Sequence, residues 1–144
     1  MVARTDPRLH FAGRHSMLID ELRVEGGFES LAQVAVFSAA LGQNRGRTSD
    51  RSNSQYDVRY SVLQTLPGGE ELISAIAIAN APLPITSDPL SEDRLDERLR
   101  LFEGFVNGGL DIISESIKNE GNALDIVFEI MNSAIAEFPL ENEI

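Results

Sequence analysis

The stretch LDERLRLFEGFVNGGLDIISESI, residues 95–117, decides the fold of this chain. Its apolar residues recur at spacings of three and four, which is the pattern of a helix that buries one face: Leu95, Leu99, Phe102, Val106, Leu110, Ile113 and Ile117. We therefore expect a long helix from about residue 89 to about residue 119. Gly108 and Gly109 interrupt it, at a cost of about 1 kcal/mol each relative to alanine. We expect them to lie inside the helix or at a kink, against another segment of the chain.

A second helix is expected over residues 30–41, SLAQVAVFSAAL. Ser30 followed by Gln33 has the form of a capping box, which satisfies free N–H groups at a helix start. Gly42 is expected at the left-handed position that ends the helix. Because this helix is apolar almost all round, it belongs in the centre of a core or at a subunit interface. We expect self-association or partner binding through it; the alternative is that surrounding helices bury it within one chain.

The remaining segments complete a mainly α fold, with about five helices and one or two short strands that could pair as a small hairpin. We expect one domain over residues 1–144. Its parts are a strand-helix-helix unit over 8–42, a polar arginine-rich loop over 43–55, and a strand followed by helices over 56–144. The expected strands are 8–11 and YDVRYSVLQ (56–64), and further helices are expected over 14–24, 70–81 and 122–138. The last helix is expected to bury Leu124, Val127, Phe128, Met131 and Ile135.

Composition and charge narrow the classes of partner. The net charge is −11, and it is divided unevenly: residues 1–60 hold eight arginines against seven acids, and residues 61–144 hold four basic residues against sixteen acids. A strongly acidic protein is repelled by nucleic acid, so only weak, local DNA contacts are expected. The absence of cysteine suits a reducing cytoplasm, and neither a signal peptide nor a membrane-spanning run is seen.

The residues carry no recognisable catalytic set. There is no nucleophile elbow and no glycine-rich phosphate loop. His10 and His15 are the only histidines, and they are five positions apart instead of the four that a helical metal pair needs. We therefore expect a protein that is not an enzyme and that has no cofactor and no metal site.

The arginines of the polar loop are the candidate contact residues. Arg45, Arg47 and Arg51 follow the apolar helix, where they compensate the negative end of its dipole. Two interpretations remain open at this point: a solvated loop, or a surface for DNA phosphates or an acidic protein face.

Two stretches resemble a known family. FESLAQVAVFSAALGQNRGR (28–47) and RLFEGFVNGGLDII (100–113) are similar to the small proteins associated with the bacterial Dnd system of DNA phosphorothioation, in particular to the fourth associated type. The similar positions include an arginine-flanked strand, an apolar helix ending in Ala-Ala-Leu-Gly, a basic step, and an Asn-Gly-Gly-Leu motif: Arg8, Phe11, Phe28, Ser30, Ala39 to Gly42, Asn44 to Arg47, and Leu101 to Leu110, with Asn107, Gly108 and Gly109 the most specific.

The resemblance implies an accessory role in phosphorothioate modification, or in the restriction that depends on it, as part of defence against phage. It implies other proteins of that system as partners and no catalytic residues. The alternative is a dimeric ribbon-helix-helix regulator of transcription, because the order of elements over 8–42 fits such a unit. In that interpretation Arg8 and His10 would project from a paired ribbon into the major groove.

Overall fold

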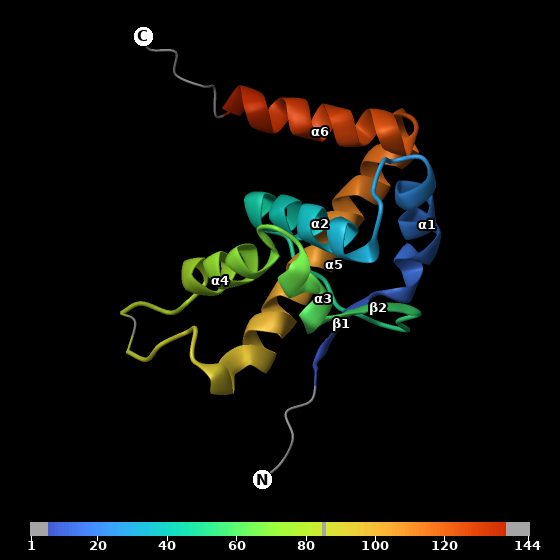
Figure 1. Ribbon diagram of the computed structural model, residues 1–144. Coiled ribbons are helices and arrows are strands. Elements are labelled where there is room, and N and C mark those ends of the chain that lie inside the picture. The colour runs from blue at the N-terminus through green and yellow to red at the C-terminus, as the bar shows by residue number, and fades with distance from the viewer. Residues whose placement is uncertain (1–5, 85, 138–144) are drawn as a thin grey trace.

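The computed structural model describes residues 6–84 and 86–137 of the chain. Two short strands, β1 and β2, and six α-helices make up this part (Figure 1). Their order and bounds are β1 (Arg8–Phe11), α1 (Ser16–Val24), α2 (Leu31–Arg45), β2 (Tyr56–Arg59), α3 (Tyr60–Thr65), α4 (Gly69–Ala79), α5 (Leu95–Glu120) and α6 (Ala123–Glu137), with short 3-10 turns η1 (Gly13–His15) and η2 (Glu92–Arg94). The expectation of a mainly helical fold with a small hairpin is confirmed.

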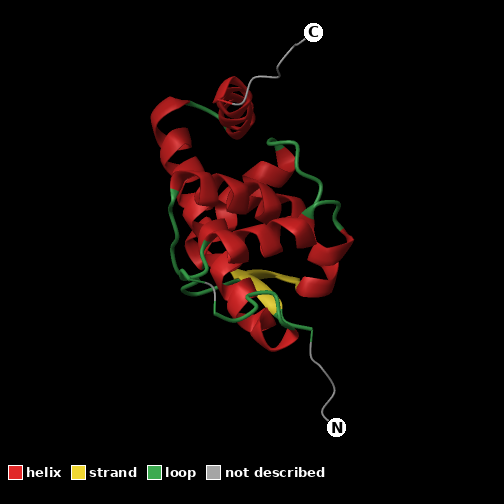
Figure 2. Cartoon of the chain, turned by 90° about the vertical axis from the view of Figure 1, so that its left-hand side faces the viewer, coloured by secondary structure: helices red, strands yellow, loops and turns green. Residues whose placement is uncertain are grey.

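Helix α5 forms the centre of the fold, and α2 and α4 pack along it. All the apolar positions predicted for its inner face are buried except Ile117, which is half-buried. One hydrophobic core contains residues from both strands and all six helices. Figure 2 shows the two strands lying at one side of the helices.

Helix α2 begins as the sequence predicts but ends later. The Ser30 hydroxyl accepts a hydrogen bond from the Gln33 N–H at 3.2 Å, which caps the first turn. The prediction that Gly42 ends the helix in a left-handed conformation was wrong, because Gly46 takes that conformation with φ 66°. Gly42 lies buried inside the helix, and the polar residues after it continue the helix to Arg45.

Much of α2 is covered within the chain, by α1, α4, α5 and β2. Leu31, Val36 and Phe37 are half-buried, and Ala40 is exposed. The part of α2 that another molecule can reach is therefore narrower than its sequence suggests.

The second strand is shorter than predicted. It pairs antiparallel with β1, with Leu9 opposite Val58, but it ends at Arg59 and the chain turns directly into α3. A residue before β1 supports this switch from strand to helix. The Asp6 carboxylate accepts hydrogen bonds from the Ser61 N–H at 3.0 Å and from the Ser61 hydroxyl at 2.5 Å. An acceptor at this position caps the free N–H groups of a new helix.

The predicted inner face of α6 was partly wrong. Val127 is buried as expected, together with Ala123 and Ile126. Leu124, Phe128 and Met131 are exposed instead, by 39%, 56% and 47%, and the side chain of Ile135 lies outside the described residues. The reason is that α6 packs mainly against α5, which covers only one side of it. Within residues 6–84 and 86–137, no helix is long and apolar enough to cross a membrane.

Candidate functional site

The arginine-rich segment lies against α5, on a strip of the helix that carries glycine. A side chain at Gly108 would overlap the carbonyl group of Arg47 and lie 2.9 Å from the Cα of Thr48. One turn earlier, the carbonyl oxygen of Gly104 accepts a hydrogen bond from the Ser49 N–H at 3.0 Å. The segment after α2 is thus held along the surface of α5, and its arginines are placed by that contact.

Two further glycines bring α2 and α5 together. A Cβ at Gly109 would lie 2.7 Å from the carbonyl carbon of Ser38, and one at Gly42 would lie 3.0 Å from that of Phe105. Real Cβ atoms do not approach backbone this closely, so both positions require the absence of a side chain. The expectation that Gly108 and Gly109 lie inside a helix against another segment is confirmed.

Four polar side chains, spaced four residues apart on α5, bind the N-terminal half of the chain. We call them the polar row: Glu103, Asn107, Asp111 and Glu115. This spacing places them on one side of the helix. Asn107 was predicted only through the family motif, and the row as a whole was not predicted. Its regular spacing of four residues was a visible signal in the sequence.

Asn107 fastens strand β1 to α5. Its side chain is fully buried, and its amide oxygen accepts a hydrogen bond from the Ala12 N–H at 2.8 Å. Its amide nitrogen donates to the carbonyl oxygens of His10, at 3.2 Å, and Glu103, at 3.1 Å. Every polar atom of the side chain is therefore paired, as burial requires.

Glu103 continues this attachment. Its carboxylate accepts a hydrogen bond from the His10 N–H at 2.8 Å and one from the Arg51 guanidinium at 3.4 Å. Arg51 also lies 2.9 Å from the Nδ1 of His10. Arg51, a predicted contact residue, is thus partly occupied in holding β1 and the polar segment together.

Asp111, the third residue of the polar row, binds Arg14. Arg14 donates to both carboxylate oxygens of Asp111 at 3.1 Å, and it donates to the Ser49 hydroxyl at 2.9 Å. Burial raises the pKa of Asp111, but hydrogen bonds from Arg14 and Ser49 outweigh it, so the pKa lies below its ordinary value. The pKa of the buried His15 is lowered, chiefly by burial, although the Asp111 carboxylate acts in the opposite direction.

The other predicted arginines divide into paired and unpaired groups. Arg47 donates to both carboxylate oxygens of Glu115, one at 2.9 Å; these hydrogen bonds are the main cause of the lowered pKa of Glu115. Arg8 binds Asp57 across the hairpin at 2.7 Å. Arg45 is exposed, and its side chain makes no hydrogen bond or ion pair with any other residue in 6–84 and 86–137. The arginines therefore do not form one continuous basic patch.

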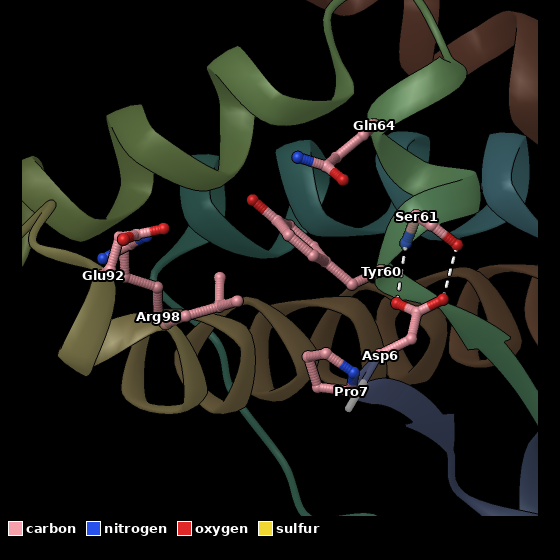
Figure 3. Close-up of a pocket in the computed structure, with 8 residues that line it drawn as sticks. Asp6, Pro7, Tyr60, Ser61, Gln64, Glu92 and Arg98 are labelled. Atoms are coloured by element: carbon pink, nitrogen blue, oxygen red, sulfur yellow. Dashed lines mark hydrogen bonds between the residues drawn. The ribbon is translucent and has the colours of Figure 1, made fainter. Parts of the chain in front are cut away.

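A hollow of about 500 Å³ lies beside α3 (Figure 3). Figure 3 shows the Tyr60 ring reaching across it toward Arg98 and Glu92, while Asp6 and Ser61 are joined at the other end. The Tyr60 hydroxyl donates to Glu70 at 2.8 Å, and Arg98 donates to the carbonyl oxygen of Ser91 at 2.7 Å. The lining contains no histidine or cysteine, and these contacts hold α3, α4 and the start of α5 in place.

Elsewhere in the described part, no group of three or more His, Cys, Asp or Glu side chains is placed to hold a metal ion.

The sequence matches the family described as DNA sulphur modification system-associated protein 4 over residues 8–143. The chain belongs to this family. The match confirms the resemblance seen in the two motif stretches, and it extends over α6 to nearly the end of the chain. No curated protein and no solved structure matches the sequence.

In this member of the sulphur modification system-associated family, the Asn-Gly-Gly-Leu motif organises the fold. Asn107 holds β1, Gly108 admits the arginine-rich segment, Gly109 admits α2, and Leu110 is fully buried in the core. The motif residues are thus inaccessible to a ligand, and a functional surface has to be sought on the outside of the molecule.

The strand pairing disfavours the alternative of a ribbon-helix-helix regulator. Such a unit pairs its strand with the same strand of a second copy, whereas β1 pairs with β2 of its own chain. On the α5 side, the N–H groups of His10 and Ala12 are bound by Glu103 and Asn107. Arg8 is bound to Asp57, so it is not presented to a DNA groove as that interpretation requires.

Proposed function

We propose that this chain is a non-enzymatic accessory component of a bacterial DNA phosphorothioation-linked modification or restriction system that defends against phage. It acts in the cytoplasm through contacts with other proteins of the system and by association with a second copy of itself. The observation that carries the proposal is the family match over residues 8–143, whose description names association with a DNA sulphur modification system.

The use of the polar side chains supports a non-enzymatic role. A catalytic site needs a nucleophile, acid or base that is free to meet a substrate. In this fold, Glu103, Asn107, Asp111 and Glu115 are engaged with the N-terminal half of the same chain. They position the arginine-rich segment and β1, which is a structural task.

The charge distribution supports protein partners over DNA. Arg47 and Arg51 would have to leave Glu115 and Glu103 to bind a phosphate, and the acids would then repel it. The net charge of −11 adds a long-range repulsion. DNA contacts in this proposal are therefore weak and local, at Arg45 and its neighbours.

Co-purification tests the protein-partner part of the proposal. The chain, carrying an affinity tag, is expressed together with the untagged modification and restriction proteins that its own genome encodes for the system. We expect at least one of them to be retained at a fixed stoichiometry after nuclease treatment, since DNA does not bridge them. Retention of none, or retention that nuclease abolishes, would contradict the proposal.

A further inference from the structure

Helices α2 and α6 enclose a small apolar trough on the outside of the molecule. It measures about 250 Å³ and is lined by Phe37, Ala40 and Leu41 of α2 and by Ile130 and Met131 of α6, with Arg45 at its edge. We call it the α2–α6 trough. Figure 1 shows α6 lying across the α2 side of the molecule, joined to the core through α5. A polar hollow of about 530 Å³ adjoins the trough and shares Arg45, Ile130 and Ser133 with it, and Glu115 and Glu129 also line this hollow.

The apolar surface continues from the trough along α6. Leu124, Phe128 and Met131 are spaced four and three residues apart, so they form one stripe on the helix. Together with the trough they form a continuous apolar surface whose largest member, Phe128, is 56% exposed. Three large, exposed apolar side chains on one face of a helix make this surface a candidate for contact with another macromolecule.

The charge of Arg45 beside the trough indicates which chemical groups a binding partner presents there. Arg45 stands at its edge without an ion pair in the described residues, whereas Arg47, Arg51 and Arg8 are bound to acids. An occupant therefore presents an apolar side chain to the trough and a carboxylate to Arg45.

Helix α6 itself carries this combination. Leu124 is followed by Asp125, and Phe128 by Glu129, so an apolar residue next to an acid occurs twice, one turn apart, on the exposed side of the helix. We propose that the occupant is a second copy of the chain, with the α6 of each copy seated on the trough of the other. This inference develops the self-association named in the proposed function. A twofold arrangement satisfies both copies at once, because each supplies the stripe and the arginine.

The size of the surface sets the strength of the contact. Fifteen residues make α6 about 22 Å long, and a strip of that length about 10 Å wide is well below the roughly 800 Å² per partner of a standard interface. We therefore expect a weak dimer, visible at protein concentrations from about 10 µM to about 1 mM. The net charges of the copies also repel each other, so 0.15 M salt, where the screening length is about 8 Å, is the suitable condition.

Sedimentation velocity of the purified full chain over that concentration range tests the proposal. Phe128→Asp places a charge in the stripe and should raise the dimer dissociation constant at least about tenfold. Leu83→Asp, on a side chain that is 85% exposed in the connector before α5, is the matched control and should leave dimerisation unchanged. Circular dichroism confirms that each variant is folded.

Charge reversal tests the role of the arginine. Arg45→Glu and Asp125→Arg should each weaken the dimer, and their combination in one chain should recover it, because the pairs are re-formed with opposite signs. A chain that remains monomeric throughout overturns the proposal and leaves the trough to a different protein. A dimer that survives Phe128→Asp, or that Arg45→Glu leaves unchanged, also overturns it. None of these outcomes affects the co-purification test, so the two failures are distinguishable.

Discussion

Replacing single glycines of α5 by alanine should change stability in opposite directions at two sites five residues apart. Gly109 and Gly104 both lie inside the helix, where alanine is favoured over glycine by about 1 kcal/mol. They differ in what the new methyl group meets. At Gly109 it would overlap the carbonyl oxygen of Ser38 and lie 2.7 Å from its carbonyl carbon, whereas at Gly104 it would lie 3.5 Å from the Cβ of Thr48.

The geometry sets the size of each effect. The obstacle at Gly109 is the backbone of α2, which cannot rotate away, so the two central helices must separate by roughly 1 Å. Overpacking of a core by one methyl group costs about 1–3 kcal/mol and occasionally more, and this site belongs to the severe end because two backbones meet. After subtracting the helix preference, Gly109→Ala should destabilise the fold by about 2–3 kcal/mol. Gly104→Ala should stabilise it by about 0.5–1 kcal/mol, because its contact is an ordinary one.

Urea unfolding followed by circular dichroism at 222 nm measures both changes. With a slope near 2 kcal/mol per molar urea, Gly109→Ala should lower the midpoint by about 1–1.5 M, and Gly104→Ala should raise it by about 0.3–0.5 M. The shared helix and the shared substitution make each variant the control for the other. A stabilised Gly109→Ala, or shifts of the same sign at both positions, would refute the close approach of α2 and α5.

Three further predictions concern the polar row and the arginines. Asn107→Ala should destabilise the fold by about 2–4 kcal/mol in the same urea assay, because it leaves the buried Ala12 N–H without an acceptor; a loss below about 1 kcal/mol would contradict this role. Burial lowers the pKa of His15 below 6.5, so the unfolded chain binds a proton that the folded chain does not, and the free energy of unfolding should fall as pH drops below about 6.5. His15→Gln should flatten the dependence of this free energy on pH below about 6.5, and an unchanged slope would contradict the role of His15. The isolated chain should retard DNA little in gel shifts near 150 mM salt, with a log–log salt slope no steeper than about −3, and Arg45→Ala with Arg47→Ala should remove what remains. Tight binding that salt does not weaken would be the contrary result.

The sequence predicted the central helix well because its information is local. The apolar spacing of α5 determines which face is buried, and two glycines within that stripe indicate the close approach of another segment. The partner of each glycine was not predictable, because Ser38 and Arg47 lie far away in the chain. Contacts between distant segments leave no mark in a local pattern.

The wrong predictions have the same origin. Two glycines, Gly42 and Gly46, were available to end α2, and the packing of Gly42 against Phe105 decides between them. Alternation in YDVRYSVLQ predicted a strand up to residue 64, but Asp6, from another part of the chain, caps α3 at Ser61. The inner face of α6 was predicted too wide, because periodicity reports an apolar face and not how much of it a neighbour covers.

The sequence located the candidate contact arginines but did not show which of them form ion pairs. In the sequence, Arg45, Arg47 and Arg51 all belong to one polar segment, and nothing in the local pattern assigns them different roles. In the structure, Arg47 and Arg51 bind acids of the polar row, and Arg45 stands at the edge of the α2–α6 trough. The positions of Glu103 and Glu115 on α5 determine which of these arginines are paired and which is left unpaired.

The plating efficiency of phage on a host that carries the complete modification and restriction system tests the central claim most directly. Deletion of the gene for this chain should raise plating, since an accessory component of the system is lost, and the unaltered gene supplied in trans should restore protection. Equal plating with and without the gene, in a host where deletion of another gene of the system raises it, would contradict the account.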